Sequence, residues 1–257
     1  MTGFIAYLKK ELWEQIVTFR LGIICTIFLL LGIISPIGAK YAMEVISALT
    51  KNSINIQMAD PTYLDSFVQF FKNISQLGVV VFIIIFYSIL SQELNKGSLI
   101  IPMSKGLSLK AVINAKFVGL IFSWTVALGI SFLSCVLYTK ILFHNMCLEG
   151  IGVLLLGTWI FGVFLISLII FSNVICKGGY VSLLLVAGCV GVLFLLNVLP
   201  DIREYIPLNL VNMDVRNVLL TQEYSLMKSG VVTCVLIIVF LLVSYLRTND
   251  KSKFCMS

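Results

Sequence analysis

Six long apolar stretches, free of charged residues and of histidine, divide the sequence. They cover residues 21–39, 74–91, 117–138, 150–175, 180–199 and 229–246. At about 1.5 Å per helical residue, each comes close to the roughly 30 Å thickness of a bilayer core. We therefore predict an all-α polytopic membrane protein with six transmembrane helices, in a single transmembrane domain that spans residues 1–257.

The first 20 residues follow a different pattern. Apolar residues recur at steps of three and four, at Phe4, Ile5, Leu8, Leu12, Ile16 and Phe19. Lys9, Lys10, Glu11 and Glu14 fall largely on the other face, and position 13 is a tryptophan. The pattern predicts an amphipathic helix over residues 1–20 that lies in the membrane interface before the first span. A soluble helix packed on a partner protein is the alternative.

A cleaved signal peptide is an alternative interpretation of the first apolar stretch. Gly38 and Ala39 are small, and Pro36 would break a helix before a cleavage site. The 20 residues that precede the stretch carry charges of both signs, however, which favours a membrane anchor.

The second span is preceded by a helix-start signal. Asp60 and Pro61 are typical of an N-cap and a first helical residue. The apolar stripe that follows consists of Tyr63, Leu64, Phe67, Phe70, Phe71 and Ile74. Because this stripe runs directly into the second span, we expect one long helix that emerges from the membrane.

Small residues recur at every fourth position through the third span. They are Ala111, Ala115, Gly119, Ser123, Ala127, Ser131 and Cys135. Such a ridge lets another helix approach closely, although a step of four overshoots one turn, so only about four members can face one neighbour. Gly152, Gly157 and Gly162 in the fourth span are interpreted as packing or bending positions. Pro200 and Pro207 break the segment 200–228 into short pieces, and whether it re-enters the membrane stays open.

The composition excludes a water-soluble enzyme, because 60% of the residues are hydrophobic and 12% are charged, against about 25% charged in soluble domains. The side that holds both termini carries 11 of the 18 basic residues but four of the 12 acidic ones. Positive charge favours the cytoplasmic side. We therefore predict a multi-pass protein of the cell membrane with cytoplasmic N- and C-termini, and we expect no nucleic-acid binding.

Residues that catalysis or metal binding would require are missing from the sequence. No span contains an acidic residue, and no His-Glu-x-x-His or Gly-x-Ser-x-Gly motif occurs, so we predict no catalytic activity on this chain. The seven cysteines show no two-residue spacing and His144 is the sole histidine, so neither a disulfide framework nor a metal site is expected. A phosphate loop is also absent, so this chain needs no cofactor of its own and ATP would have to bind a partner.

Residues 92–116, between the second and third spans, form the longest predicted cytoplasmic loop. In order along the loop come Glu93, Gly97, Ser98, Leu99, Ser104, Ser108 and Lys116. In type and spacing these residues resemble the loop after the second span in permease subunits of type 2 ABC exporters, and the interfacial helix followed by six spans is similar to that family as well. Gly106 stands where the family usually has proline, Leu109 where it has arginine, and Pro102 interrupts the apolar run.

The resemblance implies the type 2 ABC exporter fold and ATP-driven export of a hydrophobic or amphipathic substrate, such as a peptide, lipid or drug, across the bacterial cytoplasmic membrane. The implied partners are two copies of an ATPase subunit, which hold ATP and Mg²⁺, and a second permease subunit, identical or homologous. The residues implied to couple to the ATPase are Glu93, Lys96, Gly97, Ser98 and Lys116. The residues implied to line a substrate path, on the second and fifth spans, are Phe82, Phe86, Tyr87 and Asn197.

Other functions stay open at this point. The chain could be a non-transporting immunity or assembly protein of the membrane. An ion-coupled secondary transporter is a further alternative, although such proteins place ionisable groups near the middle of the bilayer. Glu93 and the loop lysines could also be solvated residues that set topology alone.

Overall fold

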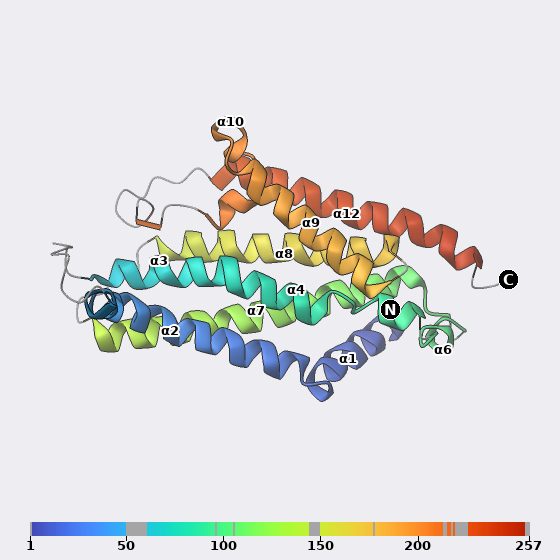
Figure 1. Ribbon diagram of the computed structural model, residues 1–257. Helices are drawn as coiled ribbons and strands as arrows, with labels where there is room; N and C mark the ends of the chain where they lie inside the picture. The colour runs from blue at the N-terminus through green and yellow to red at the C-terminus, as the bar shows by residue number, and fades with distance from the viewer. Residues whose placement is uncertain are drawn as a thin grey trace.

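The structure is a computed structural model that describes residues 2–49, 61–95, 97–104, 106–143, 150–176, 178–212, 215, 216, 218 and 226–254. Every regular element within these ranges is a helix. Long helices lie side by side along one axis, and the two chain termini lie at the same end of the bundle (Figure 1). We refer to this end as the terminal end and to the other as the distal end.

Six helices in the described ranges are long and apolar enough to cross a membrane, which confirms the six predicted spans. They are Arg20–Tyr41, Tyr63–Leu94, Leu109–Leu142, Ile151–Ile175, Gly179–Leu196 and Met227–Thr248. The individual elements are α1 (Thr2–Val17), α2 (Arg20–Leu49), α3 (Tyr63–Asn73), the π-helix η1 (Ile74–Gly78), α4 (Val79–Phe86), α5 (Ser91–Asn95), α6 (Ile100–Ser104), α7 (Leu109–Leu142), α8 (Ile151–Ile175), α9 (Gly179–Leu196), α10 (Pro200–Arg203), the 3₁₀-helix η2 (Pro207–Leu210) and α12 (Leu226–Phe254).

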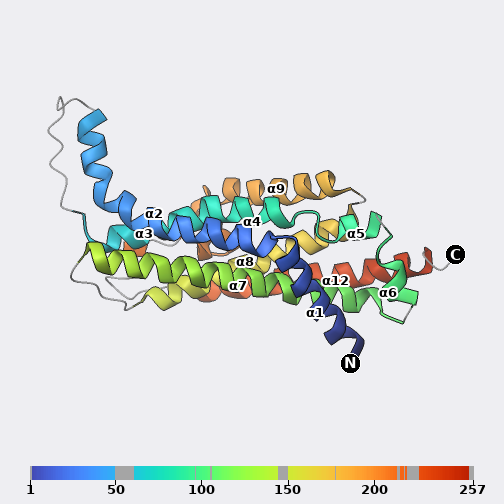
Figure 2. The same cartoon turned by 90° about the horizontal axis from the view of Figure 1, so that it is seen from below.

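The first span breaks from α1 and later bends. Phe19 lies between α1 and α2 with a φ of 56°, in the left-handed region, and the chain bends there between the two helices (Figure 1). Within α2, Pro36 lacks the backbone N–H that a continuous helix needs. Beyond it the last turns of α2 swing away from the bundle (Figure 2), as expected of a proline-associated bend.

The second span is one nearly continuous helix, as predicted, but its start differs from the prediction. Asp60 lies outside the described residues. The N-cap of α3 is Thr62, and the side chain of Asp65 accepts hydrogen bonds from the Thr62 backbone N–H (2.9 Å) and hydroxyl (3.0 Å). This capping arrangement satisfies donors that a helix start leaves free, so the helix begins at Tyr63 rather than at Pro61.

The closest helix packing confirms the small-residue ridge on the third span. α2 and α7 form the most extensive helix pair, and a Cβ added to Gly32 of α2 would lie 2.3 Å from the Ser131 carbonyl oxygen of α7. Farther along the ridge, Gly119 faces α1, where a Cβ would meet the Glu11 side chain at 3.2 Å. The ridge is therefore divided between two neighbours, as the overshoot of a four-residue step requires.

The centre of the bundle is a cluster of buried aromatic side chains around Trp124 of α7. Phe28 of α2 and Phe82 of α4 contact it edge-on, with ring centroids 5.6 Å and 5.0 Å away, an arrangement that aromatic rings favour. Gly162 of α8 lies against the same indole ring: a Cβ there would be 2.0 Å from Trp124 Nε1. Gly162 is thus a packing position, as predicted.

The segment after α9 folds back over the distal end of the bundle. Pro200 and Pro207 each begin a short helix, which fits the prediction that these prolines divide the segment. η2 packs against α8, α9 and α12, and Leu208 and Leu210 are buried there. This segment closes the distal end with apolar contacts.

Gly162→Ala should destabilise the protein, because the added methyl group cannot fit beside Trp124. Overpacking of this kind costs about 1–3 kcal/mol, and we expect a lower melting temperature in detergent. Gly152→Ala, on the same helix but with open space around its Cβ position, is the control and should melt at or above the wild-type temperature. Equal melting of the two variants would contradict the packing assignment.

Candidate functional site

α1 buries one polar stripe against the protein and exposes several apolar residues. Tyr7, Glu11 and Gln15 lie one above the other at four-residue steps and are buried, in the face that packs against α7. Trp13, by contrast, is 67% exposed, and Phe19 is 73% exposed. The outward apolar face suits a helix whose surroundings are lipid rather than water, because exposed indole and phenyl rings are favoured at a membrane interface.

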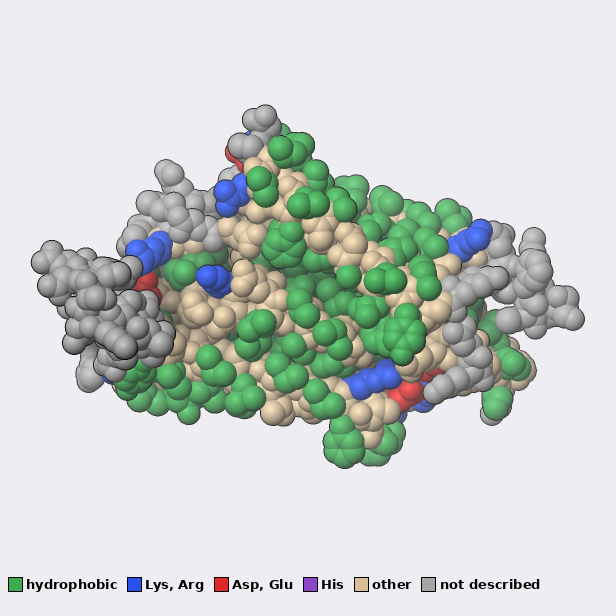
Figure 3. All heavy atoms as spheres, viewed as in Figure 1, with side chains coloured by type: hydrophobic (Ala, Val, Ile, Leu, Met, Phe, Trp, Pro, Cys, Tyr) green, Lys and Arg blue, Asp and Glu red, His purple; other side chains and the backbone are tan. Residues whose placement is uncertain are grey.

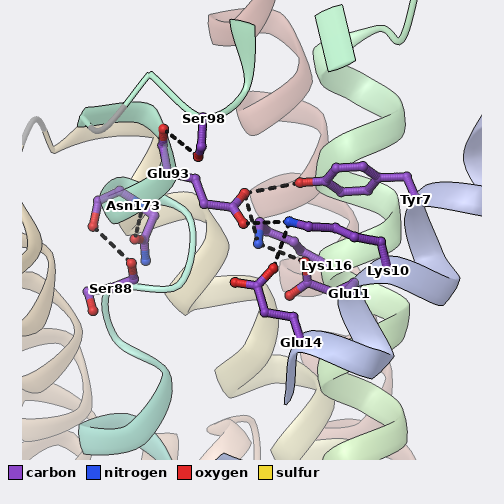
Figure 4. A network of polar contacts seen from close by, with 10 residues as sticks. Tyr7, Lys10, Glu11, Glu14, Ser88, Glu93, Ser98, Lys116 and Asn173 are labelled. Atoms are coloured by element: carbon purple, nitrogen blue, oxygen red, sulfur yellow. Dashed lines mark hydrogen bonds and ion pairs between the residues drawn. The ribbon is translucent and has the colours of Figure 1, made fainter. Parts of the chain in front are cut away.

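Lys116 of α7 lies at the centre of a buried network of charges. It is 1% exposed although it is a lysine, and its Nζ donates to Glu11 Oε2 at 2.9 Å and lies 3.1 Å from Glu93 Oε2. The three residues come from α1, α5 and α7 (Figure 4). Because α7 begins at Leu109, Lys116 lies two turns inside the helix and not at its start.

Glu93 accepts two further contacts that complete the network. The Tyr7 hydroxyl donates to Glu93 Oε2 at 3.0 Å, and Lys10 Nζ donates to Oε1 at 3.2 Å. Lys10 also pairs with Glu14 at 2.6 Å. Burial, together with the carboxylates of Glu93 and Glu11, raises the pKa of Tyr7 well above its usual value, so Tyr7 remains a hydrogen-bond donor. Burial opposes the charge on Lys10, but the carboxylates of Glu14 and Glu93 outweigh it and raise its pKa.

The network is nearly balanced in charge. Glu11, Glu14 and Glu93 bring three carboxylates within 4.8 Å of one another, a grouping that in other settings holds a cation. Here the ammonium groups of Lys10 and Lys116 lie between them, so the protein supplies the positive charge itself. A buried charge is tolerated when it is paired and hydrogen-bonded in this way. The network joins α1, α5 and α7.

The residues after Glu93 form a tight helix end. Gly97 adopts a φ of 67°, the left-handed conformation that glycine tolerates and that commonly terminates helices. The Ser98 hydroxyl then donates to the Glu93 carbonyl oxygen at 3.3 Å. Gly97 therefore makes a sharp turn at this point. The Glu93, Gly97 and Ser98 triplet fixes the direction in which the chain leaves the second span.

Asn173 of α8 supports the same region from the other side. Its Nδ2 donates to the Tyr87 carbonyl at 2.7 Å, and its Oδ1 accepts from the Ser91 backbone N–H at 2.9 Å. These two groups flank the turn between α4 and α5, where the helical hydrogen-bond ladder is interrupted. A broken helix is stable at such a place when a neighbouring side chain satisfies the freed backbone groups.

Beyond the network, α6 lies at the terminal end of the bundle (Figure 2), and we refer to it as the tip. Ile100 and Ile101 are 64% and 67% exposed there, while the adjacent Leu99 is buried. The tip is thus an apolar surface carried by a short helix whose base is tied to the bundle through Leu99 and Glu93.

The structure brings four of the five predicted coupling residues together. Glu93 and Lys116 contact each other and are buried, so they are not simply solvated residues. Gly97 and Ser98 lie beside them, and Ser98 is exposed. Lys96 lies outside the described residues.

The four residues predicted to line a path occupy three different settings. Phe82 and Phe86 are fully buried against the aromatic cluster. Tyr87 is partly buried at the turn that Asn173 supports, with its ring 6.4 Å from that of Tyr180. Asn197 lies in a cavity at the distal end.

Sequence reasoning missed Tyr7, Glu11 and Asn173 as members of the site. Tyr7, Glu11 and Gln15 are separated by four residues each, which was a visible signal for a polar stripe on α1. Asn173 is an amide within an otherwise apolar span, and buried polar groups in membrane helices need partners. Neither signal identifies the partner, because the partners lie 86 and 105 residues away for Tyr7 and Glu11.

Comparisons with known proteins give no further identification: no family model matches the chain, and no curated protein matches it significantly.

Lys116→Met should be strongly destabilising, because it leaves Glu11 and Glu93 buried without their shared cation. Removal of one partner from a buried ion pair costs about 3–5 kcal/mol, which a thermal unfolding curve in detergent will register as a lower midpoint. Lys110→Met removes an exposed lysine from the first turns of the same helix and should leave the midpoint nearly unchanged. The assigned role is wrong if both variants unfold at the wild-type temperature.

Proposed function

We propose that this protein is the membrane-spanning subunit of an ATP-driven exporter of the type 2 ABC class. It would work with two ATPase subunits that hold ATP and Mg²⁺, and with a second permease subunit of the same or a homologous sequence. The ATPases would drive alternating access of the paired permeases in the bacterial cytoplasmic membrane. The substrate would be hydrophobic or amphipathic: a peptide, a lipid or a drug.

The observation that carries the proposal is the apolar tip of α6 and its rigid attachment to the bundle. Ile100 and Ile101 are exposed on the terminal end, beyond the helices long enough to span a membrane. Exposed apolar side chains outside the lipid are typical of a protein-binding surface. Together with the resemblance of residues 92–116 to the coupling loop of the family, this surface suits an ATPase subunit.

The charge network gives the tip a route to the transmembrane helices. A force applied to α6 reaches Glu93 through the Gly97 turn, and Glu93 is joined to Lys116 of α7 and to Tyr7 of α1. Because packed helices move as units, displacement of the tip would be passed to the third span and to α1 together. This is the mechanical link that ATP-driven switching requires.

The charge distribution of the spans supports the proposed substrate class. The six predicted spans contain no charged residue, so a coupling ion would find no ionisable group at the middle of the bilayer. A hydrophobic or amphipathic molecule needs no such group. The same feature favours ATP over an ion gradient as the energy source.

The proposal is tested by co-purification with an ATPase encoded next to this gene. We expect the wild-type chain to retain this ATPase and to stimulate its ATP hydrolysis in proteoliposomes. Ile100→Ala with Ile101→Ala should weaken retention at least about tenfold, because central apolar residues dominate such interfaces. Leu133→Ala with Leu137→Ala, which removes two exposed leucines from the apolar surface of α7, is the matched control and should bind normally.

Two results would argue against the proposal. Failure of the wild-type chain to bind any neighbouring ATPase would exclude the exporter function. Retention of the ATPase without any change in its hydrolysis, in the wild type and in all variants, would instead favour a non-transporting assembly or immunity protein.

A further inference from the structure

Two adjoining cavities at the distal half of the bundle differ sharply in chemistry. The first, of about 370 Å³, is polar and lies between η1, the end of α9 and the segment that follows α10. The second, of about 580 Å³, is an apolar groove between α4 and α9. Ser75 and Gln76 of η1 line both, so the two cavities form one continuous surface. Their volumes are in the range of small-molecule sites.

The polar cavity is positively charged. Lys72 and Arg203 line it together with the amides of Gln76, Asn197 and Asn212, and no acidic residue is among its described lining residues. Among the described side chains nearby, Asp65 pairs with Arg216 and Glu204 pairs with Lys228. Among the described side chains, neither Lys72 nor Arg203 has a carboxylate within ion-pair distance. An anionic group would therefore be the complementary occupant.

Asn197 adds a second requirement on the occupant. Its Oδ1 is buried and has no hydrogen-bond partner among the described residues. A buried acceptor without a partner is costly, and a hydroxyl group on the occupant would satisfy it. The cavity thus favours a head that carries both a negative charge and a hydroxyl donor.

The apolar groove has the dimensions of one lipid chain in one leaflet. The groove runs along η1 and α4 from Gln76 to Ile84. At the helical rise per residue this length is about 12 Å, close to the roughly 15 Å depth of half a bilayer core. Its opposite wall is α9, where Leu184 is 72% exposed. Figure 3 shows apolar side chains over the face formed by α9 and α4, with basic side chains, and acidic ones beside them, towards the end near α10.

We propose that these cavities bind one anionic phospholipid of the surrounding bilayer, with its phosphate between Lys72 and Arg203 and an acyl chain in the groove between α4 and α9. A second copy of this chain is a poorer occupant, because it would bury both cations without a counter-charge unless it presented carboxylates. Binding of this lipid requires the bilayer and no ATPase. The test of the lipid site is therefore independent of the test of the proposed export function.

Native mass spectrometry of the purified chain tests the site with phosphatidylglycerol and phosphatidylcholine of identical acyl chains. Phosphatidylglycerol has the anionic phosphate and the hydroxyls, whereas phosphatidylcholine is zwitterionic and lacks a hydroxyl on its head. We expect the wild type to bind phosphatidylglycerol about tenfold more tightly, the size that charge-assisted contacts provide. Equal affinity for the two lipids in the wild type would overturn the proposal without recourse to any variant.

Variants then separate the head and chain sites. Lys72→Gln with Arg203→Gln should reduce phosphatidylglycerol binding to the level of phosphatidylcholine, while Lys140→Gln, which removes an exposed lysine from the distal end of α7, should not. Gly191→Phe fills the groove and should weaken both lipids. Gly188→Phe is its control, because Gly188 is on the same helix, also has open space and does not line the groove.

Other outcomes contradict the assignment. Unchanged lipid selectivity in the Lys72 and Arg203 variant would place the lipid elsewhere. A dimer that dissociates on Gly191→Phe, with lipid binding unaffected, would show that a second copy of the chain occupies the groove instead.

Discussion

The burial of Lys116 is the constraint on which the terminal half of the structure depends. An ammonium group that is 1% exposed needs counter-charges within contact distance, and Glu11 and Glu93 supply them at 2.9 Å and 3.1 Å. Glu11 lies in α1, and Glu93 lies at the end of the second span. The charge of Lys116 therefore determines where both of these elements lie. The same contacts bring the polar face of α1 inwards and leave Trp13 facing outwards.

α7 organises the rest of the bundle through side-chain size rather than charge. Its small residues allow α2 to approach until Gly32 lies against the Ser131 carbonyl. Its largest buried residue, Trp124, fills the space beside Gly162 and two phenylalanines. In a membrane, helices gain little from leaving lipid, so close packing and interhelical hydrogen bonds have to hold them together. The alternation of small and large side chains on α7 meets that requirement.

The two ends of the bundle serve different physical purposes. At the terminal end the network around Lys116 shares its paired charges among three helices, and the apolar tip of α6 is attached to it through Glu93 and Leu99. At the distal end Lys72 and Arg203 face a cavity without a paired carboxylate among the described side chains, next to an apolar groove. A rigid, satisfied network suits the transmission of force, whereas an unsatisfied cationic cavity suits the capture of a ligand.

The sequence by itself determined the number of membrane-spanning helices, the approximate bounds of the spans and the packing role of the third-span ridge and of Gly162. These features depend on local composition and on the helical repeat, which a single segment displays. It did not reveal that Lys116 pairs with Glu11, that Thr62 rather than Asp60 caps the second span, or that Phe82 and Phe86 are buried beside Trp124. Tertiary structure alone decided these points, because each depends on which distant segment supplies a counter-charge, a hydrogen bond or a packing surface, and a one-dimensional pattern contains the groups but not their distances.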